Sequence, residues 1–528
     1  MKSLLVSLLV CISFAGIAQQ AAPDKWFNLD MKENSSPGIS TERTYNTLLQ
    51  GKESKTVVVA VIDSGVEVGH EDLRNVIWVN EDEIPDNGID DDNNGYVDDI
   101  NGWSFIGGPG GDVHYDNLEF TRVYKGLKKR FAGKDKKDIA KADKADYERY
   151  LQMEEQYNRR VENAQKESIE FQQIVNFYEL SLETAQKELK KEDITLEDVA
   201  GLPESDEFMS AVKGFLTFAL ENDFASEIEE GKQHYNNMLS YSYNMDENFR
   251  KVVGDDYSNP REQFYGNNHV EGPAAEHGTH VAGIIAAERG NGYGIDGIAD
   301  NVRIMVIRCV PDGDERDKDV ANAIRYAVDN GAQVINMSFG KSYSPDKVVV
   351  DEAMKYAEEK GVLMVHAAGN SSHNNDKSDN FPNPIYEDSR ERCTTWIEVG
   401  ASSWDTDKLV AEFSNYGKKS VDIFAPGVDI NSTVPKGKYK VNSGTSMAAP
   451  VVSGIAAVLF SYFPELTASD VREIILNSYV DYKKVEVNHP KGGNTKFKKL
   501  SRTGGLASLY NAVKMASEWQ ANQAAAKN

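Results

Sequence analysis

The chain has 528 residues and a formal net charge of −26 at neutral pH. Hydrophobic residues make up 40% of it, which is enough to build a sizeable folded core and excludes global disorder. The excess of negative charge argues against a nucleic-acid partner, because the sequence offers no basic stripe to neutralise phosphates. The length allows two or three domains, or one large domain that carries an insertion.

The segment 1–18 is typical of a signal peptide for export. Lys2 precedes an apolar run over 4–17, and Gly-Ile-Ala at 16–18 supplies the small residues that a signal peptidase reads. We therefore predict cleavage after this segment and a secreted or periplasmic protein with no membrane span after cleavage. A retained anchor helix and a lipoprotein signal at Cys11 are the alternatives.

The next segments lead into an α/β domain. Residues 19–50 are polar and predict an N-terminal arm that ends in a short helix over 41–49. The run 57–63, Val-Val-Val-Ala-Val-Ile-Asp, is continuously apolar and β-branched, which indicates a parallel strand buried on both faces. Asp63 stands at its carboxyl end, where doubly wound sheets place their active sites. Residues 51–106 are thus the first part of this domain.

A dense acidic loop follows over 90–98, with the sequence Asp-Asp-Asp-Asn-Asn-Gly-Tyr-Val-Asp. Its spacing matches an EF-hand-type calcium loop, in which oxygen ligands alternate and one backbone carbonyl contributes. The predicted Ca²⁺ ligands are Asp90, Asp92, Asn94, the carbonyl of Tyr96, and Asp98. Asn101 stands where an EF-hand needs a glutamate, so Asp99 is an alternative closing ligand, and a solvated acidic turn is the alternative to a metal site.

Residues 107–270 are highly charged and predict a large, all-helical, coiled-coil-like insertion. Apolar or small residues recur at spacings of four and three, as in a coiled-coil seam. They are Tyr157, Val161, Ala164, Ser168, Phe171, Val175, Tyr178, Leu182, Ala185 and Leu189. After a break at 201–203, a second helix is expected to bury Phe208, Val212, Phe215 and Ala219 on one face. The resulting hairpin is either a structural appendage or an element that binds a protein partner, inhibits the domain or assists its folding.

Residues 271–528 predict the second part of the α/β domain. Apolar runs at 302–310, 334–337, 362–367 and 397–401 alternate with helical patterns at 320–329 and 347–360. This alternation predicts a doubly wound, mostly parallel sheet. A last helix is expected over 506–515. Cys309 and Cys393 form one disulfide in an oxidising compartment or remain two separate buried thiols.

Three motifs supply an Asp, a His and a Ser. Asp63 lies in Val-Ile-Asp-Ser-Gly, His277 opens His-Gly-Thr-His-Val-Ala-Gly, and Ser446 lies in Gly-Thr-Ser-Met-Ala-Ala-Pro. Amide hydrolysis at neutral pH needs a nucleophile, a base and a group that orients the base. The order Asp, His, Ser differs from that of chymotrypsin and of α/β-hydrolases. The motifs resemble those of the subtilisin-like serine proteases (subtilases, peptidase family S8) over roughly 51–105 and 270–515.

The resemblance implies a role for each motif. His277 is the base, whereas His280 is expected to be a packed, hydrogen-bonded histidine; a metal-binding pair is the alternative, but the motif lacks a zinc-protease glutamate. Asn370, in Ala-Ala-Gly-Asn, is implied to form the oxyanion site with the N–H of Ser446. The implied substrate-binding residues are Ser338, Phe339, Gly340 and Gly369. Asp72, in Glu-Asp-Leu, is a calcium ligand by resemblance, with a partner near Asn291.

These motifs predict a serine endopeptidase that acts on proteins or peptides through an acyl-enzyme, with calcium in a structural role only. The alternative is a catalytically silent subtilase fold that binds a partner through the helical insertion. One feature departs from the family: residues 19–50 are too short for the folding-assisting, inhibitory propeptide that subtilases usually carry.

Overall fold

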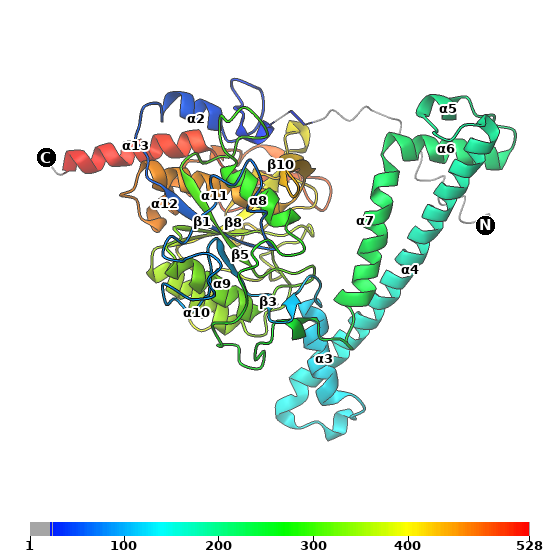
Figure 1. Cartoon of the computed structure of the whole chain (residues 1–528), viewed down its shortest axis with the longest axis horizontal. Helices are drawn as coiled ribbons and strands as arrows, with labels where there is room; N and C mark the ends of the chain where they lie inside the picture. Colours follow the sequence, from blue (N-terminus) through cyan, green and yellow to red (C-terminus); the bar gives the residue numbers. More distant parts are fainter. Residues whose placement is uncertain (1–21, 24, 527–528) are drawn as a thin grey trace.

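The computed structural model describes residues 22–23 and 25–526, so the predicted signal segment 1–18 lies outside the described residues. Its centre is a nine-stranded sheet in the order β12-β15-β9-β8-β7-β6-β1-β5-β2 (Figure 1). All neighbouring pairs are parallel except β12 with β15. The strands are β1 (Val57–Asp63), β2 (Gly102–Ser104), β5 (Val302–Arg308), β6 (Val334–Met337), β7 (Leu363–Ala367), β8 (Trp396–Ser402), β9 (Ile423–Pro426), β12 (Val480–Asp481) and β15 (Gly505–Leu506).

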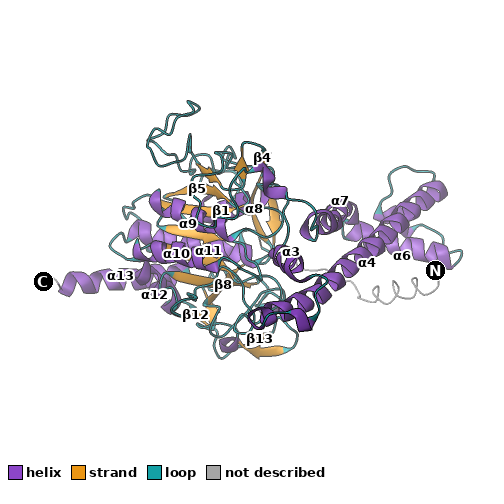
Figure 2. Ribbon diagram, turned by 90° about the horizontal axis from the view of Figure 1, so that it is seen from below, coloured by secondary structure: helices purple, strands orange, loops and turns teal. Residues whose placement is uncertain are grey.

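Helices cover both faces of the sheet (Figure 2). On one face lie α8 (Glu276–Ala286), α11 (Thr445–Tyr462), α12 (Ala468–Asn477) and α13 (Leu509–Ala526). The other face carries α9 (Asp317–Asp329) and α10 (Lys347–Glu359). Strand β1 serves both layers, because successive side chains of a strand point to opposite faces. Val59 and Val61 join the first apolar layer, and Ala60 and Ile62 join the second.

The predicted doubly wound, mostly parallel sheet is therefore confirmed. The strand predicted over 57–63 and the one over 334–337 have the predicted bounds. The helix expected from residue 506 is wrong at its start, because Gly505–Leu506 form strand β15, in which Leu506 pairs with Phe424 of β9, and the helix begins at Leu509. Cys309 and Cys393 are free and buried, so the two-thiol alternative holds.

The segment that precedes the sheet packs onto it. It contains η1 (Trp26–Asn28) and the short helix α2 (Thr41–Thr47). Trp26 and Phe27 are buried in the larger apolar cluster, and the indole Nε1 of Trp26 donates to the carbonyl of Val428 at 3.0 Å. The predicted N-terminal arm, residues 19–50, thus contributes to the core of the domain through Trp26 and Phe27.

Between β2 and α8 the chain leaves the sheet and forms a helical arm (Figure 1). The arm is entered through a small hairpin and is helical from α3 to η4. Its elements are β3 (Gly107–Gly108), β4 (Gly111–Asp112), α3 (Glu119–Phe131), η2 (Lys136–Asp138), η3 (Lys141–Asp143), α4 (Lys144–Leu189), α5 (Leu196–Ala200), α6 (Glu207–Glu221), α7 (Phe224–Asn237), η4 (Met238–Ser242) and η5 (Phe249–Val252). Helices α6 and α7 return along α4, as the predicted hairpin requires.

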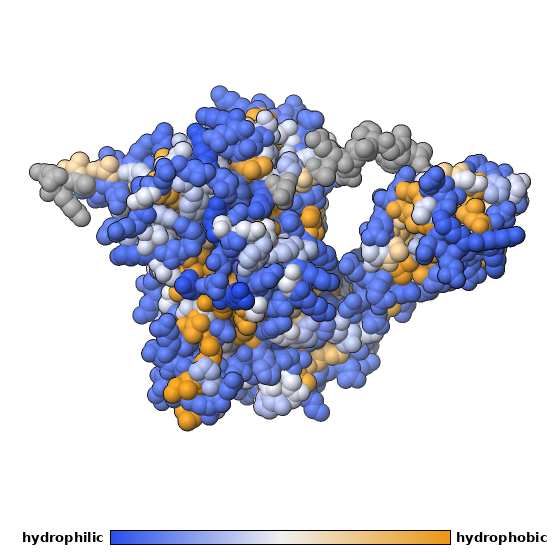
Figure 3. Space-filling view, turned by 45° about the horizontal axis from the view of Figure 1, so that its top comes forward, coloured by the Kyte–Doolittle hydropathy of each residue, from blue (hydrophilic) through white to orange (hydrophobic). Residues whose placement is uncertain are grey.

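The predicted seam lies along α4, where Tyr178 and Ala185 are buried in one cluster with residues of α6, and Val175 is also buried. The prediction for Phe208 is wrong: its side chain is 44% exposed. Met209 takes its place and forms a continuous stripe with residues 212, 216 and 219, which share one helix face at spacings of three and four. Apolar groups are visible on the surface at the distal end of the helical arm (Figure 3).

The remaining elements are two hairpins and two short turns. They are β10 (Ile430–Val434) with β11 (Lys438–Asn442), β13 (Glu486–Asn488) with β14 (Asn494–Lys496), η6 (Thr406–Lys408) and η7 (Phe497–Lys499). Among the described residues, α11 is the one helix long and apolar enough to cross a membrane, but 83% of that stretch is buried inside the domain. It is the central core helix and carries Ser446 in its first turn.

Candidate active site

Asp63 and His277, 214 residues apart in the chain, form a direct hydrogen bond. Nδ1 of His277 lies 2.7 Å from Oδ1 of Asp63, at the carboxyl end of β1 and in the first turn of α8. Gly278 permits this approach, because a Cβ there would lie 2.1 Å from the carbonyl oxygen of Gly65. Asp63 is 2% exposed and its Oδ1 also accepts from the N–H of Ser64 at 2.7 Å.

The surroundings of His277 favour its protonated form. Burial lowers the pKa of the imidazole, but the negative charge of Asp63 and its hydrogen bond raise the pKa by more, so the net shift is upward. The hydrogen bond to Asp63 is made through Nδ1, which leaves Nε2 for a proton from a nucleophile. The side chain is 41% exposed, so a substrate has access to it.

His280 has a structural environment. It is fully buried, and its Nε2 lies 3.1 Å from the carbonyl oxygen of Ile430 and 2.9 Å from that of Lys440. Burial lowers the pKa of His280 to about 4. The lowered pKa keeps the ring neutral, and two carbonyl acceptors at Nε2 indicate that this nitrogen carries the proton and donates into the β10–β11 hairpin. His280 is thus a packed, hydrogen-bonded histidine, as predicted from the sequence.

Ser446 is the second residue of α11 and lies beside Ser338. Its Oγ donates to the carbonyl of Ser338 at 3.0 Å, and the Ser338 Oγ donates to the carbonyl of Ser446 at 2.9 Å. Within the described residues, no hydrogen bond joins the Ser446 hydroxyl to His277, because the carbonyl of Ser338 takes its donor. Catalytic hydrogen bonds are often made only when substrate is bound.

The amide nitrogen of Asn370 and the backbone nitrogen of Ser446 lie near a common point at the start of α11. Its Oδ1 accepts from both the N–H and the hydroxyl of Thr445, each at 2.8 Å. A Cβ placed on Gly444 would lie 3.4 Å from Nδ2 of Asn370 and 3.6 Å from the nitrogen of Ser446. Two donors thus border one small volume at a helix N-terminus, which suits a negatively charged oxygen.

The residues predicted to bind substrate follow two paired strands, β6 and β7, and contact the first residues of α11. Ser338, Phe339 and Gly340 follow β6, and Gly340 is exposed. Gly369 follows β7 with φ of +102°, and a Cβ there would lie 2.5 Å from Nδ2 of Asn415. Only glycine fits that conformation and that contact, so the chain can turn directly into Asn370.

Part of the acidic loop clusters as a cation site would require. Carboxylate oxygens of Asp90 and Asp92 lie within 4.8 Å of one another and of an oxygen of Glu83, which was not predicted. Hard carboxylate oxygens suit Ca²⁺. None of the three forms an ion pair with a basic side chain within the described part of the chain. The position of Glu83, seven residues before the loop, matches no EF-hand spacing, so the sequence offered no signal for it.

The other predicted loop ligands accept hydrogen bonds from backbone N–H groups, as the three clustered carboxylates also do: Glu83 accepts from Asp91, and Asp90 and Asp92 accept from Asn94. The Asp98 carboxylate accepts from the N–H groups of Asn87 and Gly88 at 3.1 and 2.9 Å. The Oδ1 of Asn94 accepts from the N–H of Tyr96 at 2.8 Å. The loop therefore closes on its own backbone, and its three clustered carboxylates come from Glu83, Asp90 and Asp92 rather than from the EF-hand positions alone.

Asp72 is fully buried in a second, separate cluster. Its carboxylate accepts from Nδ2 of Asn291 at 2.6 Å, from the N–H of Ile295 at 3.0 Å and from the hydroxyl of Tyr439 at 3.1 Å. The expected proximity to Asn291 is present. In this arrangement protein donors satisfy the carboxylate.

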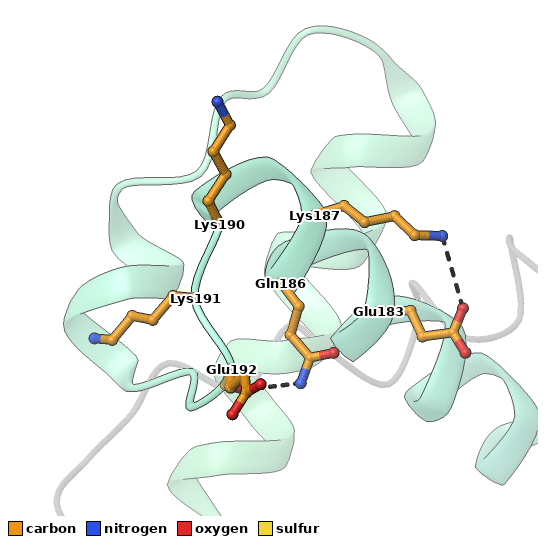
Figure 4. A pocket seen from close by; sticks show the side chains of 6 residues that line it. All are labelled: Glu183, Gln186, Lys187, Lys190, Lys191 and Glu192. Carbon is orange, nitrogen blue, oxygen red and sulfur yellow. Dashed lines mark hydrogen bonds and ion pairs between the residues drawn. The ribbon is translucent and has the colours of Figure 1, made fainter.

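A shallow hollow at the tip of the arm, at the end of α4, has no comparable chemistry (Figure 4). Its lining is charged, with Glu183 and Lys187 paired at 4.0 Å. Lys190 and Lys191 extend away from one another into solvent (Figure 4). The hollow contains no nucleophile beside a base.

The family model described as "Subtilase family" matches residues 54–496. The chain belongs to the subtilase family. It is 44% identical over 199 residues to the thermophilic serine proteinase of Bacillus sp. (strain AK1), a match that covers 38% of this chain and 46% of that protein. It is 38% identical over 198 residues to subtilisin DY of Bacillus licheniformis, covering 37% of this chain and 67% of that protein. With thermitase of Thermoactinomyces vulgaris the identity is 37% over 203 residues, covering 38% and 66%.

The subtilase chain thus spans about half the length of the first of these relatives. All three are serine proteases by name or by family, so the family assignment supports a serine peptidase. The matched stretches cover less than two fifths of this chain.

Proposed function

We propose that this subtilase is a serine endopeptidase in which Ser446 is the nucleophile, His277 the base and Asp63 the group that orients the base. The observation that carries the proposal is the 2.7 Å contact between Asp63 and His277, which lies on a helix packed against α11, the helix that carries Ser446 in its first turn. Two donors, from Asn370 and Ser446, border a common space in the same region. A buried aspartate, a half-exposed histidine and a serine in this arrangement suit acyl transfer.

The reaction proceeds in two halves. Nε2 of His277 takes the proton of the Ser446 hydroxyl as Oγ attacks the scissile carbonyl, and the oxyanion forms between Nδ2 of Asn370 and the N–H of Ser446. Asp63 accepts from Nδ1–H and stabilises the imidazolium. The imidazolium then protonates the leaving amine, and an acyl-enzyme remains on Ser446. Water, deprotonated by His277, hydrolyses the ester and restores the hydroxyl.

We also propose a structural calcium ion, held by Glu83, Asp90 and Asp92, with the Tyr96 carbonyl as a further ligand. The support is the crowding of three carboxylates within 4.8 Å without a basic partner. A bound divalent cation would offset their mutual repulsion and so stabilise the loop. It takes no part in the chemistry at Ser446.

The proposed setting is outside the cytoplasm, with protein or peptide substrates. The support is the signal-like sequence of residues 1–18.

A fluorophosphonate probe tests the proposal. The folded protein is expected to be labelled at Ser446, whereas Ser446→Ala and His277→Ala proteins are not. Ser226→Ala is a matched control, because this serine lies on α7 in the arm and its loss should leave labelling unchanged. A folded protein that is not labelled and does not cleave an unfolded substrate would instead be a silent subtilase fold that binds partners.

A further inference from the structure

Lys341 lies three residues beyond Ser338 and is buried under the first turn of α3. Its Nζ is 3.0 Å from Oε2 of Glu119 and 2.8 Å from Oδ1 of Asp317. It also donates to the carbonyl of Glu315 at 2.8 Å. The predicted substrate-binding residues 338–340 therefore run directly from Ser446 to a residue of the insertion. We refer to residues 338–340 as the peptide track.

The insertion also pairs with the backbone of the neighbouring segment 312–315. The N–H of Asp312 donates to the carbonyl of His114 at 2.8 Å, and the N–H of Asp116 donates to the carbonyl of Asp312 at 2.9 Å. Tyr115 and Asp312 form a parallel bridge. An extended peptide that paired with this segment would need its backbone N–H and carbonyl groups. Residues of the insertion already occupy the N–H and the carbonyl of Asp312.

Side chains of the first turn of α3 complete this contact. The N–H of Glu119 donates to Oδ2 of Asp314 at 2.7 Å. Arg122 donates to the carbonyls of Asp314 and Glu315 at 3.0 and 3.2 Å and pairs with Oε2 of Glu119 at 2.7 Å. The ring of Phe120 lies 5.8 Å from that of Tyr343, two residues beyond Lys341.

This junction is rigid rather than a movable flap. The side chains of Lys341 and Glu119 are 1% and 2% exposed, and that of Arg122 is 11% exposed. Separating the elements would leave buried charges without partners, which is strongly unfavourable. The ordering of α3 against the track is therefore part of the folded domain.

The spacing limits how much peptide can lie on the track. A fully extended chain rises about 3.3 Å per residue, so the three steps from Ser338 to Lys341 span at most roughly 10 Å. A peptide extended beside the track has the same rise. We take the track, which the subtilase motifs imply to bind substrate, as the place of the residues on the N-terminal side of the scissile bond, so about three of them fit before α3.

We propose that the first turn of α3, residues 118–122, closes the peptide track after the third substrate residue on the N-terminal side of the cleaved bond. The substrates are peptides whose recognition on that side ends within about three residues. This inference rests on the proposed function, because it takes Ser446 as the point of attack. The insertion then acts as a determinant of specificity, with Glu119, Arg122 and Lys341 as positioning residues.

A series of quenched fluorescent peptides tests this inference. The peptides share one sequence, are acetylated, and carry two to six residues before the cleaved bond. We expect kcat/KM to rise up to three residues and then to stay within about twofold, with no preference for any side chain at the fourth position. A tenfold or larger rise between three and six residues would overturn the closed track.

Variants separate this effect from general damage. Phe120→Ala in α3 is expected to loosen the turn and to let a fourth residue raise kcat/KM, whereas Glu183→Gln at the arm tip should leave the whole series unchanged. If Phe120→Ala fails to fold, the series on the native protein still decides. If Ser446 is labelled by the probe but kcat/KM keeps rising beyond three residues, the closed track is refuted and the proposed function is not. Absence of labelling refutes the proposed function and this inference together.

Discussion

Replacing Asn370 by alanine isolates the proposed oxyanion donor. Its Nδ2 is one of two donors that border the space beside Gly444, and the other, the N–H of Ser446, cannot be removed by substitution. In subtilisin, loss of one such side-chain donor lowers kcat about 10²–10³-fold, or roughly 2.7–4 kcal/mol, and we adopt that range. The loss should fall on kcat with KM nearly unchanged, because the oxyanion exists only after attack.

The Asn370 side chain also accepts a hydrogen bond at the start of α11, and this structural role must be distinguished from its proposed role as an oxyanion donor. Oδ1 of Asn370 accepts from the N–H of Thr445, the first residue of α11. Removing that acceptor should cost about 1 kcal/mol of stability, as for a lost helix cap. Asn370→Asp keeps the acceptor but replaces the donor with a negative charge. We expect it to fold as stably as the native protein and to lose more kcat than Asn370→Ala.

Steady-state kinetics on a peptide ester and thermal unfolding of both variants are the required measurements. A decrease in kcat smaller than tenfold for Asn370→Ala, or an effect confined to KM, would refute the assignment. Near-native activity of Asn370→Asp beside reduced activity of Asn370→Ala would indicate that Asn370 acts only through the start of α11.

Two further predictions concern titration and metal. Only neutral His277 accepts the serine proton, and Asp63 raises the pKa of His277. Activity should therefore fall on acidification with a midpoint above the ordinary histidine pKa of about 6.5. In Asp63→Asn this acidic limb of the kcat/KM profile should move to lower pH, and an unmoved limb would contradict the pairing of Asp63 with His277. Removing calcium with a chelator should lower the melting temperature. Glu83→Gln should abolish this calcium-dependent difference in melting temperature, whereas Glu81→Gln, at an exposed neighbouring position, should preserve it. Equal melting temperatures of the native protein with and without calcium would exclude the site.

The sheet was predictable because its signals are local. Residues 57–63 are apolar without interruption, and a strand covered on both faces needs that pattern. The candidate catalytic residues were predictable for a different reason: each lies in a short motif at a strand end or helix start. Fold topology then brings Asp63 and His277 to 2.7 Å across 214 positions, a distance that the motifs alone do not contain.

What the sequence did not predict depends on tertiary packing. Phe208 and Met209 are both apolar at the start of α6, and only the position of α4 decides which one is buried. Glu83 reaches the acidic loop from outside its repeat. Lys341 is an ordinary lysine in the sequence, yet it is 1% exposed because Glu119 and Asp317 neutralise it from two distant elements. Such residues become interpretable only when their partners are placed.

A long insertion between Asp63 and His277 need not disturb the candidate active site, because the insertion is bound to the domain near both of its ends. Ser104 and Asn267 form an antiparallel bridge, and Nε1 of Trp103 donates to the carbonyl of Tyr265 at 2.8 Å. Val113 and Tyr265 belong to the apolar cluster on the sheet. The position of the helices between these anchors therefore does not determine the positions of Asp63 and His277. The buried pairs at Lys341 form a third anchor, so changes in α3 should act on the substrate positions beyond Gly340 rather than on the Asp63–His277 contact.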